Sequence, residues 1–123
     1  MTQPLALVVY EKLLPGTQLV NKLQDLGYRV QTVSEPLELV RLAERDGPLL
    51  VFADLESTRS NVLEVISRLR ANPATQHLPV VAFGPENKEG LQEAARSSGV
   101  TLFASEATLI DQLAALLQQA LLI

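Results

Sequence analysis

Asp54 is the acidic residue whose position in the sequence most favours a chemical role. It ends the apolar run 49-LLVFAD-54, which is typical of a strand buried on both faces of a parallel sheet. Open α/β sheets bind ligands at the carboxyl ends of such strands. Glu11 and Glu106 follow two other apolar runs, so they could meet Asp54 at the same edge. Three carboxylates in one place could hold a divalent cation or a small ligand.

Other kinds of chemical site find little support in the sequence. The chain has no cysteine, which excludes disulfides, thiolate zinc sites and cysteine nucleophiles. His77 is the only histidine, and its predicted loop indicates a surface position. Ser57, Ser60 and Ser105 have no histidine partner at a suitable place, so a serine triad is unsupported. The segment 84-GPENKEG-90 lacks the order of elements that a phosphate-binding Walker loop requires.

Charge and hydropathy place further limits on the function. The net charge of −4 disfavours non-specific binding of nucleic acid. Arg59, Arg68 and Arg70 alternate with acids, so we interpret them as a solvated helix face. No apolar run reaches the roughly 18 residues of a membrane span, and residues 1–12 show no signal peptide. We therefore expect a cytoplasmic protein that does not bind membranes.

Short apolar runs alternate with helical patterns along the chain. The predicted strands are 5–10, 28–33, 49–54, 78–83 and 100–104. The predicted helices are 14–27, 36–46, 61–71, 88–98 and a last one starting near Thr108, with Ser34, Asn61 and Thr108 as N-terminal caps. Strict alternation of this kind predicts one α/β domain over 1–123, a parallel five-stranded sheet covered by helices on both faces.

One long segment resembles a known family. The stretch 53-ADLESTRSNVLEVISRLRANPATQHLPVVAF-83 is similar to the CheY-like receiver domains of response regulators, including the R-x-x-P-x-T turn. The stretch 28-YRVQTVSEPLELVRLAE-44 is similar to the family's second strand and helix. The resemblance covers the whole chain and implies a flavodoxin-like three-layer sandwich with strand order 2-1-3-4-5. It places Asp54 at the phosphorylated aspartate of the family.

Several positions that support phosphorylation in the family differ in this chain. Tyr10 stands where the family has one metal-binding acid, and Glu11 stands at the other. Gly84 occupies the position of a serine or threonine hydroxyl. Glu106 occupies the position of a lysine, which reverses the charge that would face a phosphoryl group. These departures are typical of a pseudo-receiver, in which the phosphoacceptor position is inactive.

The resemblance implies a non-enzymatic, bacterial two-component or phosphorelay signalling module that works by protein contact, independently of phosphorylation. The implied partners are a kinase, an output domain or a second copy of the chain, and no cofactor is required. Two alternatives stay open. One is a working receiver phosphorylated on Asp54, with Mg²⁺ held by Glu11 and Asp54. The other is a small-ligand or metal-binding α/β domain that uses Glu11, Asp54 and Glu106.

The last predicted helix carries more apolar residues than one buried face requires. Excess apolar surface of this kind marks contact sites between proteins. We therefore expect a partner surface, or a weak homodimer, formed by the fourth predicted helix, the last strand and the last helix. Its predicted residues are Phe103, Leu109, Leu113 and Leu116.

Overall fold

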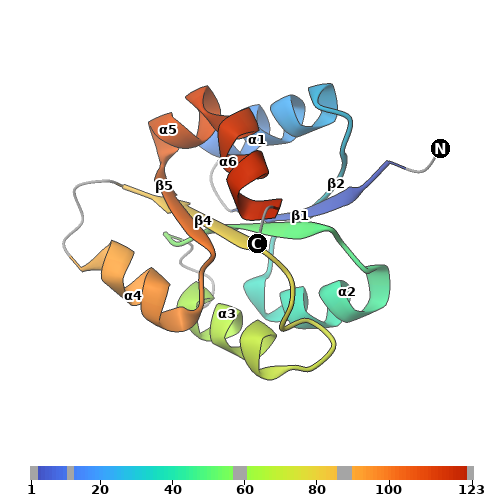
Figure 1. Cartoon of the computed structure of the whole chain (residues 1–123), viewed down its shortest axis with the longest axis vertical. Coiled ribbons are helices and arrows are strands. Elements are labelled where there is room, and N and C mark those ends of the chain that lie inside the picture. The colour runs from blue at the N-terminus through green and yellow to red at the C-terminus, as the bar shows by residue number, and fades with distance from the viewer. Residues whose placement is uncertain (1–2, 11–12, 57–60, 86–89, 122–123) are drawn as a thin grey trace.

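A single parallel sheet forms the centre of the molecule (Figure 1). The computed structural model describes residues 3–10, 13–56, 61–85 and 90–121. Its strands are β1 (Leu5–Val9), β2 (Arg29–Val33), β3 (Leu50–Asp54), β4 (Val80–Gly84) and β5 (Leu102–Ser105). They lie in the order β2-β1-β3-β4-β5 and pair in parallel throughout. The predicted strand number, direction and order are confirmed.

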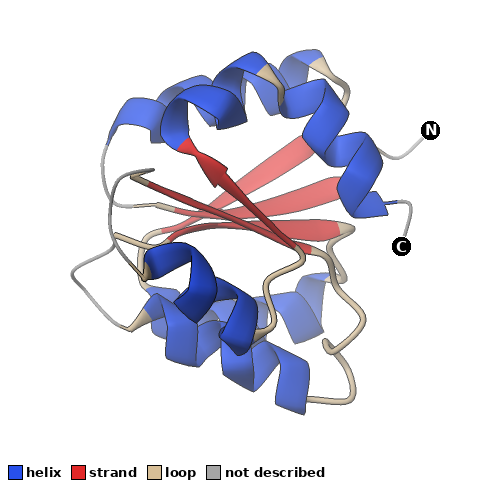
Figure 2. Cartoon of the chain, turned by 60° about the vertical axis from the view of Figure 1, so that its left-hand side comes forward, coloured by secondary structure: helices blue, strands red, loops and turns tan. Residues whose placement is uncertain are grey.

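Helices cover both faces of the sheet and complete three layers, as Figure 2 shows. The described helices are α1 (Leu13–Asp25), a 3-10 turn η1 (Pro36–Glu38), α2 (Leu39–Asp46), α3 (Val62–Ala71), α4 (Leu91–Ser98), α5 (Glu106–Asp111) and α6 (Leu113–Leu121). Helices α1, α5 and α6 lie on one face, and α2, α3 and α4 lie on the other (Figures 1 and 2). None of the described helices is both long and apolar enough to cross a membrane.

Burial follows the position of each strand in the sheet. Every residue of β1, β3 and β4 is buried, as their unbroken apolar sequences predict for strands covered on two faces. The edge strands β2 and β5 are only partly buried. Two apolar clusters fill the space between the sheet and its helices, one on each face. Because all neighbouring strands are parallel, their carboxyl ends lie at one edge of the sheet.

Most helix ends follow from local sequence. Asn61 caps α3, and its side chain accepts a hydrogen bond from the backbone N–H of Glu64 at 3.3 Å, as predicted. Gly47 and Gly99 end α2 and α4 in the left-handed conformation, with φ of 58° and 102°. The predicted cap at Ser34 is wrong. Glu35 takes that role and accepts from Leu37 N–H at 3.1 Å, which starts η1 before α2.

The last predicted helix begins earlier than expected and is divided. Ser105 caps α5, since its Oγ accepts from the backbone N–H of Thr108 at 3.3 Å, so the predicted start near Thr108 is wrong. Gln112 leaves the helical conformation, with φ −114° and ψ 23°, and separates α5 from α6. The single predicted helix is therefore two helices joined at one residue.

The predicted partner surface is wrong for two of its four residues. Leu109 and Leu113 are 0% and 3% exposed and belong to the core between the sheet and α1. Their spacing of four residues places them on one helix face, which turns toward the sheet. Leu116 and Phe103 are partly buried and keep some exposed surface. Leu109 and Leu113 therefore offer almost no surface to a partner.

Arg70 connects three elements at the edge opposite Asp54. Its guanidinium donates hydrogen bonds to the carbonyl oxygens of Gly99, Leu78 and Gln76 at 2.7, 2.5 and 3.0 Å. It also donates to Thr101 Oγ1 at 3.1 Å. The surrounding protein removes water from this group, which lowers its pKa. The end of α3 is thereby tied to the chain segments that lead into β4 and β5.

The interpretation of the arginines as a solvated face is therefore wrong for Arg70. It is right for Arg68, which is exposed and pairs with Glu64 one turn away at 3.1 Å. Arg59 lies outside the described residues. Thr75 is fully buried and donates from its hydroxyl to the carbonyl oxygen of Leu69 at 2.8 Å. The R-x-x-P-x-T turn thus serves the packing of α3 against β4 and β5.

Candidate functional site

The register of the sheet brings the predicted site residues to one edge. Val9 pairs with Ala53, so the following residues, Tyr10 and Asp54, come level with each other. Gly84 pairs with Ser105, which directly precedes Glu106. The strand order reverses between β1 and β3, and such switch points are where open α/β sheets bind ligands.

Asp54 is the buried acid of this edge. Only 2% of its surface is exposed, and it is the last residue of β3. Its Oδ1 accepts a hydrogen bond from the backbone N–H of Glu56 at 2.9 Å. The backbone N–H of Leu55 donates to Phe83 O at 3.0 Å and fixes the chain directly after the strand. The carboxylate is consequently held in one orientation by a turn of the main chain.

Tyr10 contributes packing at the end of β1. Its half-buried side chain lies against the apolar cluster between the sheet and α1. The ring also lies on Gly16 in α1, where an added Cβ would come within 2.1 Å of Tyr10 Cδ2. Gly16 therefore leaves room for the ring. Tyr10 thus packs on α1 at a sequence position where the family that the chain resembles has an acid.

Apolar side chains surround the position of the missing hydroxyl at Gly84. A Cβ at Gly84 would lie 3.0 Å from Leu91 Cδ2, 3.8 Å from Leu55 Cβ and 3.9 Å from Phe103 Cε2. Leu91 is buried at the start of α4, and Phe103 is half-buried in β5. The end of β4 therefore meets three hydrocarbon groups. A hydroxyl at this position would have to share its space with Leu91.

Glu106 has a local structural role. It is the first residue of α5 and is partly buried. Acidic side chains in the first turn interact favourably with the positive end of the helix dipole. The capping by Ser105 and the acid at Glu106 both favour the start of α5 at this point. The residue that stands at the lysine position thus also stabilises a helix N-terminus.

A metal site at this edge remains a prediction. Among the described residues, no group of three or more histidine, cysteine, aspartate or glutamate side chains could hold a metal ion. Glu11 lies outside the described residues, so the proposed ligand pair of Glu11 and Asp54 is not tested. The same holds for the hypothesis that Glu11, Asp54 and Glu106 form one site. His77 is exposed, as its predicted loop indicates.

Solved structures show the fold class directly. No protein-family model and no curated protein sequence matches the chain. A protein named as a response regulator from Chloroflexus aurantiacus superposes with a TM-score of 0.91 at 16% identity, covering 99% of this chain and 100% of that one. The chain therefore has the fold of the CheY-like receiver domains. The chemotaxis response regulator CheY4 of Vibrio cholerae has the same receiver fold, with a TM-score of 0.85, 18% identity and coverage of 97% and 99%.

A receiver domain with a similar fold carries a metal ion. The receiver domain of a sensor histidine kinase from Pseudomonas aeruginosa has a TM-score of 0.87 and 22% identity, with 98% of each chain covered. That protein coordinates Mg²⁺ in its active-site cleft.

Sequence reasoning missed the residues that fill this edge. Leu55, Leu91 and Gly16 were not singled out, although all three contact a predicted site residue or the space beside it. Leu91 is the first residue of α4 and its apolar side chain is buried there, which is the one available sequence signal. Gly16 lies inside α1, where glycine is unfavourable, and an unexplained glycine in a helix indicates a close approach.

Proposed function

We propose that the chain is a receiver module of a two-component signalling system that acts through protein contacts without phosphorylation of Asp54. The observation that carries this proposal is the apolar surrounding of Gly84. Leu55, Leu91 and Phe103 face the position from which a hydroxyl would bind a phosphoryl oxygen. Phosphoryl transfer depends on positioned polar and charged groups, and this part of the edge supplies hydrocarbon instead.

The charge at Glu106 supports the same proposal. A carboxylate about 4 Å from a phosphoryl group opposes it by about 4 kcal/mol per unit charge at an effective dielectric constant near 20. A lysine at that position would contribute a similar energy with the opposite sign. At that separation Glu106 would disfavour an aspartyl phosphate, while it favours the start of α5.

A working receiver phosphorylated on Asp54 is the second candidate. One observation favours it, namely that Asp54 keeps the buried position at the end of β3 and an oriented carboxylate. The related fold that binds Mg²⁺ in its cleft suggests the metal such a reaction would use. Asp54 would attack the donor phosphorus, and the donor would leave with its bonding electron pair. Other groups would then have to replace the hydroxyl that Gly84 lacks and the positive charge that Glu106 lacks.

Intact-mass measurement after incubation with acetyl phosphate and Mg²⁺ separates the two candidates. We expect the wild type to show no added phosphoryl group. A variant with Tyr10→Asp, Gly84→Thr, Leu91→Ala and Glu106→Lys restores the missing groups and makes room for the hydroxyl, so it should gain one phosphoryl group. Asp54→Asn in that background is the control. An adduct on the wild type that Asp54→Asn removes would favour the working receiver.

A further inference from the structure

A small apolar groove opens between α1 and the junction of α5 with α6. Its volume is about 230 Å³. Leu26, Ile110 and Ala114 line it, with Leu113 as a buried floor. Leu26 follows the end of α1 and is 47% exposed, so its apolar side chain can contact a partner. Helices α1 and α5 run along the same face of the molecule in Figure 1, which places the groove on that helical layer.

Three charged side chains at the rim of this groove lack partners in the described structure. Lys22, Asp25 and Asp111 line the groove together with the apolar residues. All three are exposed, and none forms an ion pair or a side-chain hydrogen bond with a residue in the described ranges. The rim therefore presents one positive and two negative groups around an apolar centre.

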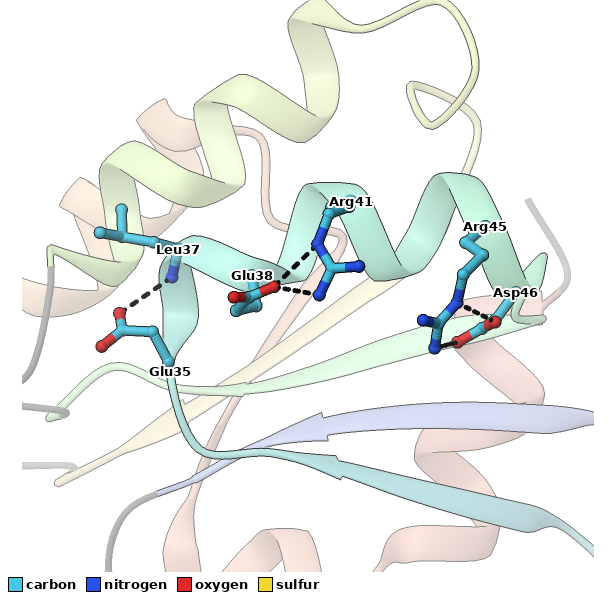
Figure 3. Close-up of polar contacts among 6 residues, drawn as sticks. All are labelled: Glu35, Leu37, Glu38, Arg41, Arg45 and Asp46. Atoms are coloured by element: carbon cyan, nitrogen blue, oxygen red, sulfur yellow. Dashed lines mark hydrogen bonds and ion pairs between the residues drawn. The ribbon is translucent and has the colours of Figure 1, made fainter.

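Charged side chains on the opposite helical layer are paired with one another. Figure 3 shows that Arg41 pairs with Glu38 and that Arg45 pairs with Asp46 through two hydrogen bonds of 2.8 and 3.0 Å. Two further pairs of the same layer join Arg68 to Glu64 and Arg96 to Glu93. Charges on α2, α3 and α4 are thus satisfied locally. Those at the α1–α5 groove remain available to a partner.

We propose that this groove is the contact site for a second copy of the chain, related by a two-fold axis. The proposal rests on the proposed function, because it names the partner of a module that works by protein contact. An axis that passes near Leu26 and Ile110 brings α1 of one copy against α5 of the other. Lys22 then faces Asp111 of the other copy, and the same pair forms a second time by symmetry.

The charge pattern favours a second copy over other occupants. A two-fold interface must be self-complementary, and a rim with both signs of charge satisfies that condition. Apolar contact between the two copies of Leu26 and Ile110 supplies the centre, and the ion pairs set the orientation. The groove is small, so the dimer belongs to the weak class of interfaces. The overall charge of −4 on each copy opposes association further.

Sedimentation velocity over a range of concentrations tests the dimer. We expect reversible dimerisation of the wild type at roughly millimolar concentration or below, and about a hundredfold weaker association for Leu26→Glu. Leu37→Glu is the matched control, because Leu37 is 59% exposed on the opposite layer and should leave the dimer unchanged. A wild type that stays monomeric throughout, or a Leu37→Glu effect as large as that of Leu26→Glu, would overturn the proposal.

Charge reversal gives a test whose expected result, a heterodimer, misfolded variants could not produce. Lys22→Asp alone and Asp111→Lys alone each place like charges opposite one another and should weaken self-association about tenfold. When the two variants are mixed, both contacts become attractive, so a heterodimer should form. A mixture that remains as weakly associated as its components would refute the proposed orientation.

Repeating the measurement with acetyl phosphate and Mg²⁺ separates this inference from the proposed function. We expect the same dimerisation constant with and without these reagents. Dimerisation through the groove that requires acetyl phosphate would contradict the phosphorylation-independent function and leave the docking surface intact. Absence of a dimer under both conditions would refute the proposed dimer contact and would leave the proposed function unaffected.

Discussion

Replacing Arg70 by methionine is expected to destabilise the fold by about 3 kcal/mol. Methionine keeps an apolar stem against Gly99 and removes the guanidinium. Three of its four hydrogen bonds, those to Gly99 O, Leu78 O and Thr101 Oγ1, lie in partly buried surroundings. A net contribution of about 1 kcal/mol for each gives the estimate, and the exposed bond to Gln76 O adds little because water replaces it.

Urea unfolding followed by circular dichroism measures this loss. For a chain of this length, about 3 kcal/mol corresponds to a fall in Tm of roughly 10 to 15 °C. Arg68→Met is the matched control, since Arg68 lies on the same helix with an exposed pair to Glu64, and its loss should be about 0.5 kcal/mol or less. A loss below about 1 kcal/mol for Arg70→Met, or equal losses for both variants, would refute the role assigned to Arg70.

Three further predictions concern the core and the edges of the sheet. Gly16→Ala should lower Tm because its Cβ would meet the Tyr10 ring, and Tyr10→Ala in the same chain should recover part of the loss; a more stable single variant would contradict this packing. Leu109→Ala should lower the free energy of unfolding by about 2 to 5 kcal/mol, and Leu116→Ala should lower it clearly less, since only Leu109 is fully buried. Equal losses in denaturant unfolding would contradict this difference in burial. Burial raises the pKa of Tyr28 above its ordinary 10.0, so Tyr28 ionises at lower pH in the unfolded chain, and stability is lost as the pH rises through the folded pKa. Tyr28→Phe should reduce this alkaline loss of stability in thermal melts taken above that pH. An unchanged loss would exclude Tyr28 as its source.

The sheet could be predicted because its sequence signals are local and strong. The runs that became β1, β3 and β4 are apolar apart from Asp54 at the end of β3, as a strand covered on both faces requires. The glycines at the ends of α2 and α4 marked those ends correctly. Strand order followed from the alternation of elements and from the resemblance of 53–83 to a receiver domain.

The divided last helix could not be predicted from the same signals. Leu109, Leu113 and Leu117 continue one apolar face across the break at Gln112, and neither glycine nor proline marks the interruption. Arg70 presents a similar difficulty, because two arginines on one helix look alike in sequence. The carbonyl groups that bind Arg70 come from distant turns, so its role depends on tertiary structure.

The sequence shows where the candidate site departs from the family it resembles, but it does not show how the site is packed. Gly84 and Glu106 differ in identity from the hydroxyl and the lysine that the resemblance implies at these positions. That Leu91 and Phe103 fill the space beside Gly84 depends on how α4 and β5 meet the end of β4. Sequence spacing carries no information about that contact, since the three residues belong to different elements.

Two-dimensional ¹H–¹⁵N NMR with Mg²⁺ and beryllofluoride tests the central claim most directly, because beryllofluoride mimics a phosphoryl group on a carboxylate. The account predicts that the amide resonances of Asp54, Gly84 and Phe103 stay unchanged as the reagent is added. The variant that carries the restoring substitutions is the positive control and should respond. Saturable shifts at Gly84 and Phe103 of the wild type, absent in Asp54→Asn, would contradict the proposal that the chain acts without phosphorylation.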